Sequence, residues 1–412
     1  MSDLAWIDAA ITAARPQAVG ALLRYFRDLD AAEEAFQEAS LRALKKWPLN
    51  GPPRDPTAWL VFVGKNSGID AVRRRSRERA LPDEAAISDL EDAEAAVISE
   101  LDDADYRDDV LRLLFVCCHP DLPATAQVAL ALRVVCGLPV PRIARAFLVG
   151  DDAMEQRITR GKARVAEANV PFEAPGSHER AARLAAVSTV LYLIFNEGYS
   201  ATGATADARA PLCDEAIRLG RLLLRLFPSE PAIMGLLALM LLQHARTPAR
   251  HQNDELVLLE DQDRKKWDRE MIAEGLALID KAMRHRAPEP YQVQAAIAAL
   301  HARASTFDDT DWAQIDLLYA SLERLQPSPV VTLNRAVAVS KVRGPEVALA
   351  MIVPLAPRLG GYFHFHGLRG ALLTQLGRDT EAREALNRAI SLANTPAEAT
   401  HIRQCLDRLV KR

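Results

Sequence analysis

A repeat of 34 residues in the last third of the chain constrains its fold more tightly than any other sequence feature. Five positions recur at this spacing, as the pairs Ala336 and Gly370, Val339 and Leu373, Ala348 and Ala382, Ile352 and Leu386, and Leu355 and Ala389. Small residues that return at such a period predict stacked pairs of helices that cross closely. One pair cannot bury its apolar face alone, so the period predicts an array of neighbouring pairs.

Weaker traces of the same spacing extend the predicted array toward the middle of the chain. Ala216 and Pro228 lie 12 residues apart, and 311–327 forms a looser unit. We expect about four to six helix pairs between about 210 and 410, with 247–266 as an insertion between helices. The spacing is that of the tetratricopeptide (TPR) repeat. Such an array presents a concave surface, which serves either for binding or as a structural cap or dimerisation face.

The composition favours helices in the rest of the chain as well. Alanine, leucine and arginine dominate, only 6% of the residues are aromatic, and runs of β-branched residues are few. With 412 residues the chain is too long for one ordinary domain, and 49% apolar residues supply sizeable cores. A net charge of -4 excludes a uniformly basic nucleic-acid coat protein, although it allows a local basic surface. We therefore predict an all-α protein of several domains.

The cysteines and the N-terminus indicate a cytoplasmic protein. Five cysteines are scattered without a Cys-x-x-Cys pair, which argues against a disulfide framework and against a zinc site. The first ten residues have no basic segment, so no signal peptide is expected. The most apolar stretch, 232–242, is about half as long as a membrane span, so we expect no membrane contact. We also expect no metal and no cofactor, because no nucleotide-binding or calcium-binding motif is present.

The distribution of charge divides the chain. Residues 1–80 hold 13 Lys and Arg and 10 Asp and Glu, with a dense arginine cluster near the end. Residues 81–110 hold 12 acidic residues and one arginine, which is typical of a linker. Basic residues return between 133 and 164. The predicted parts are a first domain at 1–80, an acidic linker at 81–107, a second domain at 108–170 and the helical array at 175–412.

The first domain begins with an acidic helix. Its apolar spacing predicts a helix over 31–47. Glu33 and Glu34 lie in the expected first turn, where the helix dipole favours acidic side chains. Pro48 is expected to end this helix, and a loop rich in proline and glycine follows.

A basic helix completes the first domain. Thr57 is the expected N-cap of a helix over 58–79, which ends in the arginine cluster at 73–79. Two interpretations of that end stay open: a solvated helix terminus, and a surface that follows nucleic-acid phosphates. The neighbouring Trp59 is either a core residue or a platform on which unpaired bases stack.

The second domain has the pattern of a helix, a tight turn and a basic helix. A short amphipathic helix is predicted over 140–148, and a longer helix over 153–168 follows a turn with an aspartate N-cap. Basic residues populate the longer helix: Arg157, Arg160, Lys162 and Arg164. The arrangement is that of a helix-turn-helix that reads DNA, although helical hairpins of other kinds share it. Gly161 is expected to weaken the longer helix by about 1 kcal/mol relative to alanine.

Together these segments resemble the extracytoplasmic-function sigma factors of bacterial RNA polymerase. Residues 32–39 resemble the family's polymerase-binding helix in sigma domain 2. Residues 54–60 and 65–75 resemble the segment that melts and reads the −10 promoter element. Residues 137–164 resemble the domain 4 helix-turn-helix that reads the −35 element. The resemblance implies two small helical sigma domains, and the acidic linker lies where the family has a variable one.

The resemblance also implies roles for particular residues. It implies that the clamp and flap regions of the polymerase core are partners and that binding involves Glu33, Glu34, Phe36, Gln37 and Glu38. It implies contacts with the −10 element by Trp59, Lys65, Asn66, Asp70, Arg73, Arg74 and Arg75. It implies contacts with the −35 element by Gln156, Arg157, Arg160, Lys162 and Arg164. Arginine side chains would then hold backbone phosphates and read guanine edges in the major groove.

The long C-terminal part distinguishes this chain from ordinary members of the family, which end soon after the helix-turn-helix. Its array, with the segments 195–199 and 258–264, resembles a sigma-factor subgroup with a fused TPR-bearing C-terminal domain. In that subgroup the extension is thought to regulate activity. The resemblance implies either an intramolecular contact with the sigma domains or an unknown protein or ligand on the TPR-like surface.

We therefore expect a sigma factor, not an enzyme, that gives RNA polymerase its promoter specificity. One alternative is a one-component transcriptional regulator that binds duplex DNA without the polymerase core. The acidic helix distinguishes the two, because such a regulator has no need of it. A further alternative is an enzyme that uses the carboxylates of 196–199 and 260–263, although no nucleophile or phosphate-binding loop accompanies them.

Overall fold

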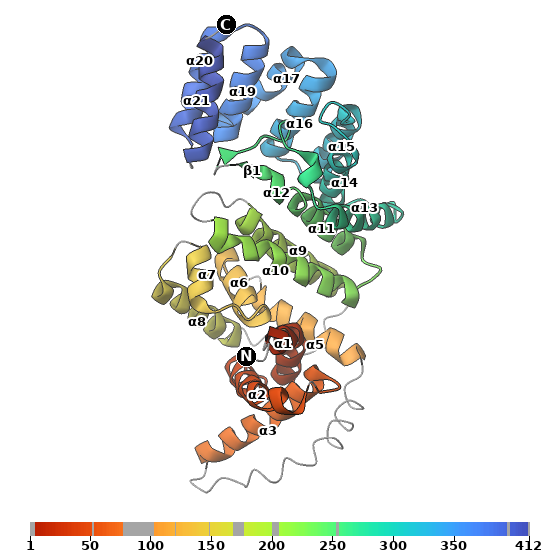
Figure 1. Ribbon diagram of the computed structural model, residues 1–412, viewed down its shortest axis with the longest axis vertical. Coiled ribbons are helices and arrows are strands. Elements are labelled where there is room, and N and C mark those ends of the chain that lie inside the picture. The colour runs from red at the N-terminus through yellow and green to blue at the C-terminus, as the bar shows by residue number, and fades with distance from the viewer. Residues whose placement is uncertain are drawn as a thin grey trace. The chain divides into compact units, whose positions relative to one another are not determined.

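The structure is a computed structural model, and it divides the chain into two compact units, Met1–Ile194 and Phe195–Arg412 (Figure 1). It describes residues 5–51, 53–76, 103–119, 121–147, 149–167, 177–199, 206–252, 255–393 and 396–410. Apart from one pair of two-residue strands, the regular elements in these ranges are helices, so the all-α prediction is confirmed. Within them, no helix is both long and apolar enough to cross a membrane.

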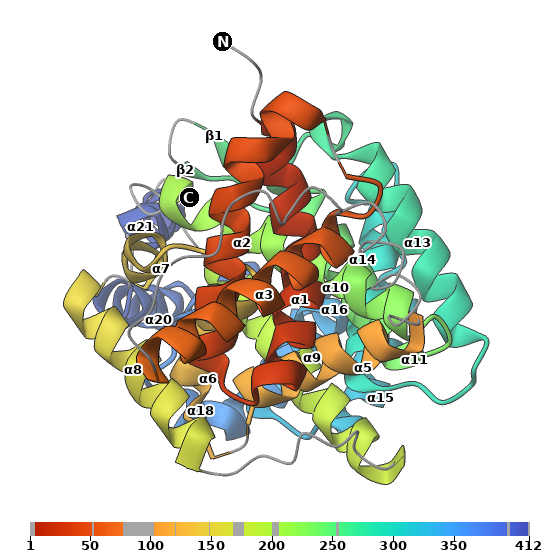
Figure 2. The same ribbon diagram turned by 90° about the horizontal axis from the view of Figure 1, so that it is seen from below.

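The first unit contains both predicted sigma domains. Its elements are α1 (Ala5–Phe26), α2 (Leu29–Asn50), α3 (Pro56–Ser76), α5 (Asp103–Cys117), α6 (Ala124–Leu130), the π-helical turn η2 (Ala131–Val135), α7 (Val140–Ala146), α8 (Asp151–Glu167) and most of α9 (Ser177–Tyr199). Helices α1, α2 and α3 pack against one another, as Figure 2 shows. Helix α1 also packs against α5 and η2, so the two predicted domains share an interface. Most of the predicted acidic linker lies outside the described residues.

Helix α2 is longer at both ends than the sequence predicts. Asp28 caps it by accepting a hydrogen bond from a first-turn amide, so Asp30 lies in the first turn and Glu33 follows one turn later. Pro48 does not end the helix, because α2 continues for two residues beyond it, to Asn50. The helix ends instead at Gly51, whose φ of 80° lies in the left-handed region that glycine adopts easily.

The N-cap of α3 also differs from the prediction. The Asp55 carboxylate accepts hydrogen bonds from the amides of Thr57 and Ala58, at 2.8 and 3.1 Å. Asp55 therefore performs the capping role predicted for Thr57. A carboxylate that satisfies two amides at a helix start also gains from the helix dipole, which a threonine hydroxyl does not.

Helices α7 and α8 lie where the sequence predicts a helix, a turn and a second helix. The face of α8 formed by Met154, Ile158 and Val165 is buried. Gly161 lies on the same face, and a Cβ atom there would be 3.0 Å from the Cδ1 atom of Leu130 in α6. The glycine that weakens the isolated helix therefore allows its close packing against α6.

The second unit continues as a series of helices from the end of α9. Its elements are α10 (Ala206–Leu226), α11 (Pro231–His244), α12 (Thr247–Arg250), β1 (His251–Gln252), β2 (Glu255–Leu256), η4 (Arg264–Lys266), α13 (Arg269–Met283), α14 (Pro290–Arg303), α15 (Trp312–Leu325), α16 (Pro329–Arg343), α17 (Pro345–Ile352), η5 (Val353–Leu355), α18 (Ala356–Leu359), α19 (Phe363–Gln375), α20 (Asp379–Ser391) and α21 (Pro396–Val410). The strands β1 and β2 form a short antiparallel ribbon between α12 and η4. The predicted insertion at 247–266 thus separates α11 from α13.

The residues of the 34-residue period lie where neighbouring helices cross. Ala336, Ala348 and Ala382 are fully buried in one apolar cluster with residues of α16, α17, α19 and α20. A Cβ atom at Gly370 would lie 2.6 Å from the Cδ2 atom of Leu386, so α19 and α20 cross closely at this glycine (Figure 1). Small residues are therefore required where the period places them, and the assignment to the TPR family stays a prediction.

Candidate functional site

The predicted polymerase-binding residues of α2 are divided between the surface and the interior. Glu34, Gln37 and Glu38 are exposed, with Glu38 in an ion pair to Arg42 one turn later on the same helix. Phe36 is 2% exposed and belongs to the core. Glu33 is 4% exposed, and a carboxylate this deeply buried requires partners.

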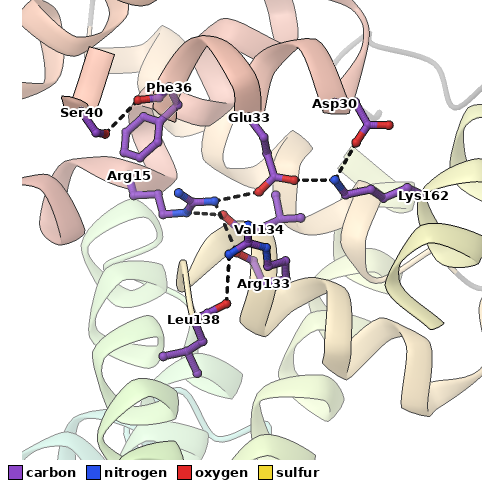
Figure 3. A network of polar contacts seen from close by, with 9 residues as sticks. All are labelled: Arg15, Asp30, Glu33, Phe36, Ser40, Arg133, Val134, Leu138 and Lys162. Carbon is purple, nitrogen blue, oxygen red and sulfur yellow. Dashed lines mark hydrogen bonds and ion pairs between the residues drawn. The ribbon is translucent and has the colours of Figure 1, made fainter. Parts of the chain in front are cut away.

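Glu33 lies at the centre of a polar network between α1, α2 and α8, shown in Figure 3. Its Oε1 atom accepts a hydrogen bond from Arg15 Nη2 at 2.8 Å. Its Oε2 atom pairs with Lys162 Nζ at 2.7 Å, and the same ammonium group lies 2.6 Å from Asp30 Oδ1. Both oxygens of the buried carboxylate are therefore paired with cations, one from each predicted sigma domain.

Arg15 extends this network to the π-helical turn η2. Its Nε atom donates to the carbonyl oxygen of Val134 at 2.8 Å, and its Nη2 atom donates to that of Arg133 at 3.3 Å. Carbonyls at the end of a helix lack partners within the helix, and Arg15 supplies donors for two of them. Its guanidinium also lies over the ring of Phe36, 4.9 Å from the centroid. Burial lowers the pKa of Arg15, although the adjacent Glu33 carboxylate opposes that shift.

Sequence reasoning missed both Arg15 and Asp30 as members of this network. A signal was present, because Arg15 occurs on a helix whose residues Ala14, Ala18 and Leu22 are apolar and buried. An arginine among such residues requires a buried acceptor, which the sequence does not identify. Asp30 carries no comparable signal, because an acidic residue in a first helical turn is ordinary.

The ion pairs of Lys162 should be lost at high pH. Burial acts to lower the pKa of Lys162, but the hydrogen bonds to Asp30 and Glu33 outweigh it and raise the pKa above its usual value. Between the unfolded and folded pKa values the native state keeps a proton that the unfolded state has lost, so stability falls as the pH rises. We expect the wild type to lose more stability than Lys162→Met above about pH 10.5, measured by urea unfolding at several pH values. Equal losses would contradict the pairing.

The basic residues of α8 differ in exposure. Gln156, Arg160 and Arg164 are exposed, and Arg160 donates to Gln156 over 3.5 Å. Arg157 is half-buried. Lys162 is half-buried and held by the acids of α2, so it differs from the other predicted −35 residues.

The residues predicted to contact the −10 element also differ in exposure. Trp59 is 5% exposed and packs edge-to-face on Trp47, with 5.4 Å between ring centroids, so the structure favours the core interpretation over base stacking. Lys65 lies over the ring of Tyr25 at 5.3 Å, and Asn66 is exposed. Helix α3 includes Asp70, Arg73, Arg74 and Arg75, whose side chains lie outside the described part of the structure.

Comparison with known proteins shows what the N-terminal part of the chain is similar to. Residues 10–78 match the profile of Sigma-70 region 2, and this match covers most of α1 and all of α2 and α3. The probable ECF RNA polymerase sigma factor SigI of Mycobacterium tuberculosis is 28% identical over 166 residues, which are 40% of this chain and 56% of that protein. The chain therefore carries a Sigma-70 region 2 domain near its N-terminus and is similar to a probable ECF sigma factor over part of its length.

The C-terminal part of the chain has a family match of its own. Residues 183–283 match a family of unknown function, DUF6596, and they extend from α9 to α13. An uncharacterised protein of Rhizobium meliloti (strain 1021) is 68% identical over 410 residues, which are 99% of this chain and 97% of that protein. The similarity therefore includes the sigma domains and the C-terminal helices in one continuous chain.

Proposed function

We propose that the protein is a sigma factor that acts in the cytoplasm, binds core RNA polymerase and directs promoter-specific transcription initiation, without being an enzyme itself. The observation that carries the proposal is the match of α1 to α3 to Sigma-70 region 2, together with the exposed acidic and amide side chains on α2. The similarity to a probable ECF sigma factor supports the same function.

The exposed residues of α2 would recognise the polymerase. Glu34, Gln37 and Glu38 offer hydrogen-bond acceptors and negative charge at the surface, whereas Glu33 and Phe36 contribute to the fold of the unit. Electrostatic complementarity of this kind mainly increases association rates and selects the correct partner. The clamp region of the core would receive this helix.

Promoter recognition would involve α8 at the −35 element and α3 at the −10 element. Gln156, Arg160 and Arg164 are exposed on α8, and exposed arginine and glutamine side chains can read guanine and adenine edges. Lys162 would reach DNA only after its ion pairs with Asp30 and Glu33 break. We therefore assign base reading to the other polar residues of α8.

Arg157→Ala should weaken discrimination at the −35 element. If Arg157 forms a bidentate contact with one guanine, we expect a loss of about 1–3 kcal/mol of preference for that base. Competition binding of the polymerase holoenzyme to promoters with single −35 substitutions measures this loss of base preference. Arg225→Ala, which removes an exposed arginine of α10, is the matched control. An unchanged base preference in Arg157→Ala would remove this residue from the proposed recognition surface.

Capture of purified core polymerase tests the polymerase assignment. The double variant Glu34→Lys and Glu38→Lys reverses the charge at two exposed positions of α2, and we expect it to bind the core at least tenfold more weakly. Glu384→Lys, at an exposed position of α20, should bind like the wild type. Binding of duplex promoter DNA without any capture of the core would favour the one-component regulator instead.

We further propose that the C-terminal domain controls this activity through its TPR-like surface. The fusion of the DUF6596 segment to the sigma domains in one chain supports this role, since both are present in the Rhizobium relative. Comparison of promoter activity between the full chain and a chain ending at residue 175 tests it. Equal activity under all growth conditions would argue against a control role.

A further inference from the structure

Three arginines lie close together in the second unit. The guanidinium carbons of Arg246 and Arg264 lie 5.6 and 4.7 Å from the ring centroid of Trp267. The guanidinium carbon of Arg250 lies 3.7 Å from the ring centroid of Tyr199, and its Nη1 atom donates to the carbonyl oxygen of that residue at 2.6 Å. We call Arg246, Arg250, Arg264 and Trp267 the cationic cluster.

The positive charge of this cluster is only partly balanced, because the Asp309 carboxylate acts to raise the pKa of Arg264 without forming an ion pair with it. Within the described ranges, none of its arginines forms an ion pair, and their hydrogen bonds go to neutral groups. Arg246 Nε donates to the amide oxygen of Gln262 at 3.3 Å. Arg264 Nη1 donates to the carbonyl oxygens of His301 and Ala304, the latter at 2.8 Å, at the end of α14. All three arginines are half-buried, and partly desolvated charges of this kind are stabilised when an opposite charge accompanies them.

Several buried polar atoms of the cluster also lack hydrogen-bond partners. They are Arg264 Nη2, Trp267 Nε1 and the Nδ1 atom of the adjacent His301. Trp267 is only 3% exposed, so water does not replace the missing acceptor at its indole nitrogen. Two of these atoms, Arg264 Nη2 and Trp267 Nε1, are hydrogen-bond donors. Buried donors are satisfied in the great majority of cases, and unsatisfied donors beside excess positive charge indicate an anionic acceptor.

The electrostatics of the cluster agree with this geometry. Burial lowers the pKa of Arg246 and of Arg264, and a neighbouring arginine lowers each further, although Tyr199 opposes the shift at Arg246 and Asp309 opposes it at Arg264. Burial, together with Arg246 and Arg264, lowers the pKa of His301 to about 4. His301 is therefore neutral at pH 7, and the positive charge comes from the arginines.

We propose that the cationic cluster binds a small oxyanion, the carboxylate or phosphate group of a small molecule. Arginine guanidinium groups suit both acceptors, because their N–H donors match the spacing of oxyanion oxygens. The cluster joins the two C-terminal segments that the sigma function leaves unused, since Tyr199 ends the first and both Gln262 and Arg264 belong to the second. Its arginines and Trp267 lie within the DUF6596 match, so the proposal assigns that segment a ligand independently of promoter recognition.

Thermal unfolding of the full chain with defined anions tests the site. Sodium phosphate and sodium succinate serve as the two probes, and sodium chloride at equal ionic strength is the reference. We expect at least one probe to raise the melting temperature with saturable dependence on its concentration, because a ligand of the folded state stabilises it. A response to phosphate alone would indicate a phosphate ligand, and a response to succinate alone a carboxylate ligand. No saturable response to either probe would overturn the proposal.

Two variants separate binding from a structural role. Arg246→Met removes one unbalanced charge, so its melting temperature in chloride should equal or exceed that of the wild type, while its affinity for the probe falls at least tenfold. Arg264→Gln should lose affinity as well, and circular dichroism reports whether it still folds without the guanidinium at the end of α14. Arg284→Gln, at an exposed position after α13, is the control and should bind normally. If Arg246→Met binds the probe as well as the wild type, the cluster is not the site.

Discussion

Replacement of Glu33 by glutamine should lower the free energy of unfolding of the first unit by about 3–5 kcal/mol. The carboxylate is 4% exposed and pairs with Arg15 through one oxygen and with Lys162 through the other. Glutamine keeps the shape of the side chain but removes the charge, so Arg15 is left buried beside a neutral amide. The penalty arises mainly from that uncompensated guanidinium, since Lys162 keeps Asp30 as a partner.

Chemical denaturation of the full chain, followed by hydrogen exchange of the backbone amides of α1 and α2, measures this effect in the first unit. Glu38→Gln is the matched control, because Glu38 is exposed and its ion pair with Arg42 lies on one helix. Such a pair contributes about 0.3–0.5 kcal/mol. Joint replacement of Arg15 by methionine and Glu33 by leucine should recover part of the loss, since no isolated charge then remains. Similar losses for Glu33→Gln and Glu38→Gln would contradict the buried network.

Gly235→Ala should destabilise the second unit by about 1–3 kcal/mol or more. Gly235 lies in α11, at the place where the first turn of α14 packs against that helix. A Cβ atom there would lie 2.5 Å from Gln292 Cγ and 2.9 Å from both the backbone N and Cα of the same residue. Rotation of a side chain cannot relieve the backbone contacts, so α11 and α14 must move apart. Gln292 also accepts from the amide of Glu289 at 3.1 Å, so its displacement disturbs the start of α14 as well.

Gly367→Ala provides the control for this substitution. Gly367 lies inside α19, and a Cβ atom there would meet only Ile402 Cδ1 at 3.7 Å, an ordinary contact. Because alanine favours the helix over glycine by about 0.8–1 kcal/mol, this variant should be as stable as the wild type or more stable. Thermal unfolding of both variants compares them. A destabilisation of Gly367→Ala equal to that of Gly235→Ala would contradict the close approach of α11 and α14.

The sequence predicted the kinds of element and much of their placement. Apolar spacing and helix-favouring composition predicted an all-α chain, and α7 and α8 begin and end within two residues of the predicted bounds. The residue types near the helix ends predicted where the helices begin and end less accurately. Pro48 was predicted to end α2, and Thr57 was predicted to cap α3, because both residue types usually do so. The structure uses Gly51 and Asp55 instead, since several acceptable residues stood next to one another.

Contacts between distant residues could not be predicted from one sequence. Glu33 and Phe36 resemble a polymerase-binding surface in sequence, yet they are buried because Arg15 of α1 lies against both and Lys162 of α8 pairs with Glu33. Lys162 has the helical spacing of a DNA-reading residue, but its partners lie more than a hundred positions away. The segments that contain Tyr199 and Arg264 resemble those of a sigma-factor subgroup, but the sequence predicted no chemical role for them. Only the fold brings their side chains into one cluster.

Promoter-dependent transcription with purified core polymerase tests the central claim most directly. Run-off transcripts are measured from a promoter selected by the wild-type holoenzyme, with the full chain, with the Glu34→Lys and Glu38→Lys double variant, and with Glu384→Lys. We predict correctly initiated transcripts with the wild type and with Glu384→Lys, a loss of at least tenfold with the double variant, and none with core polymerase alone. Transcripts that do not depend on the added chain, or equal activity of all three proteins, would contradict the account.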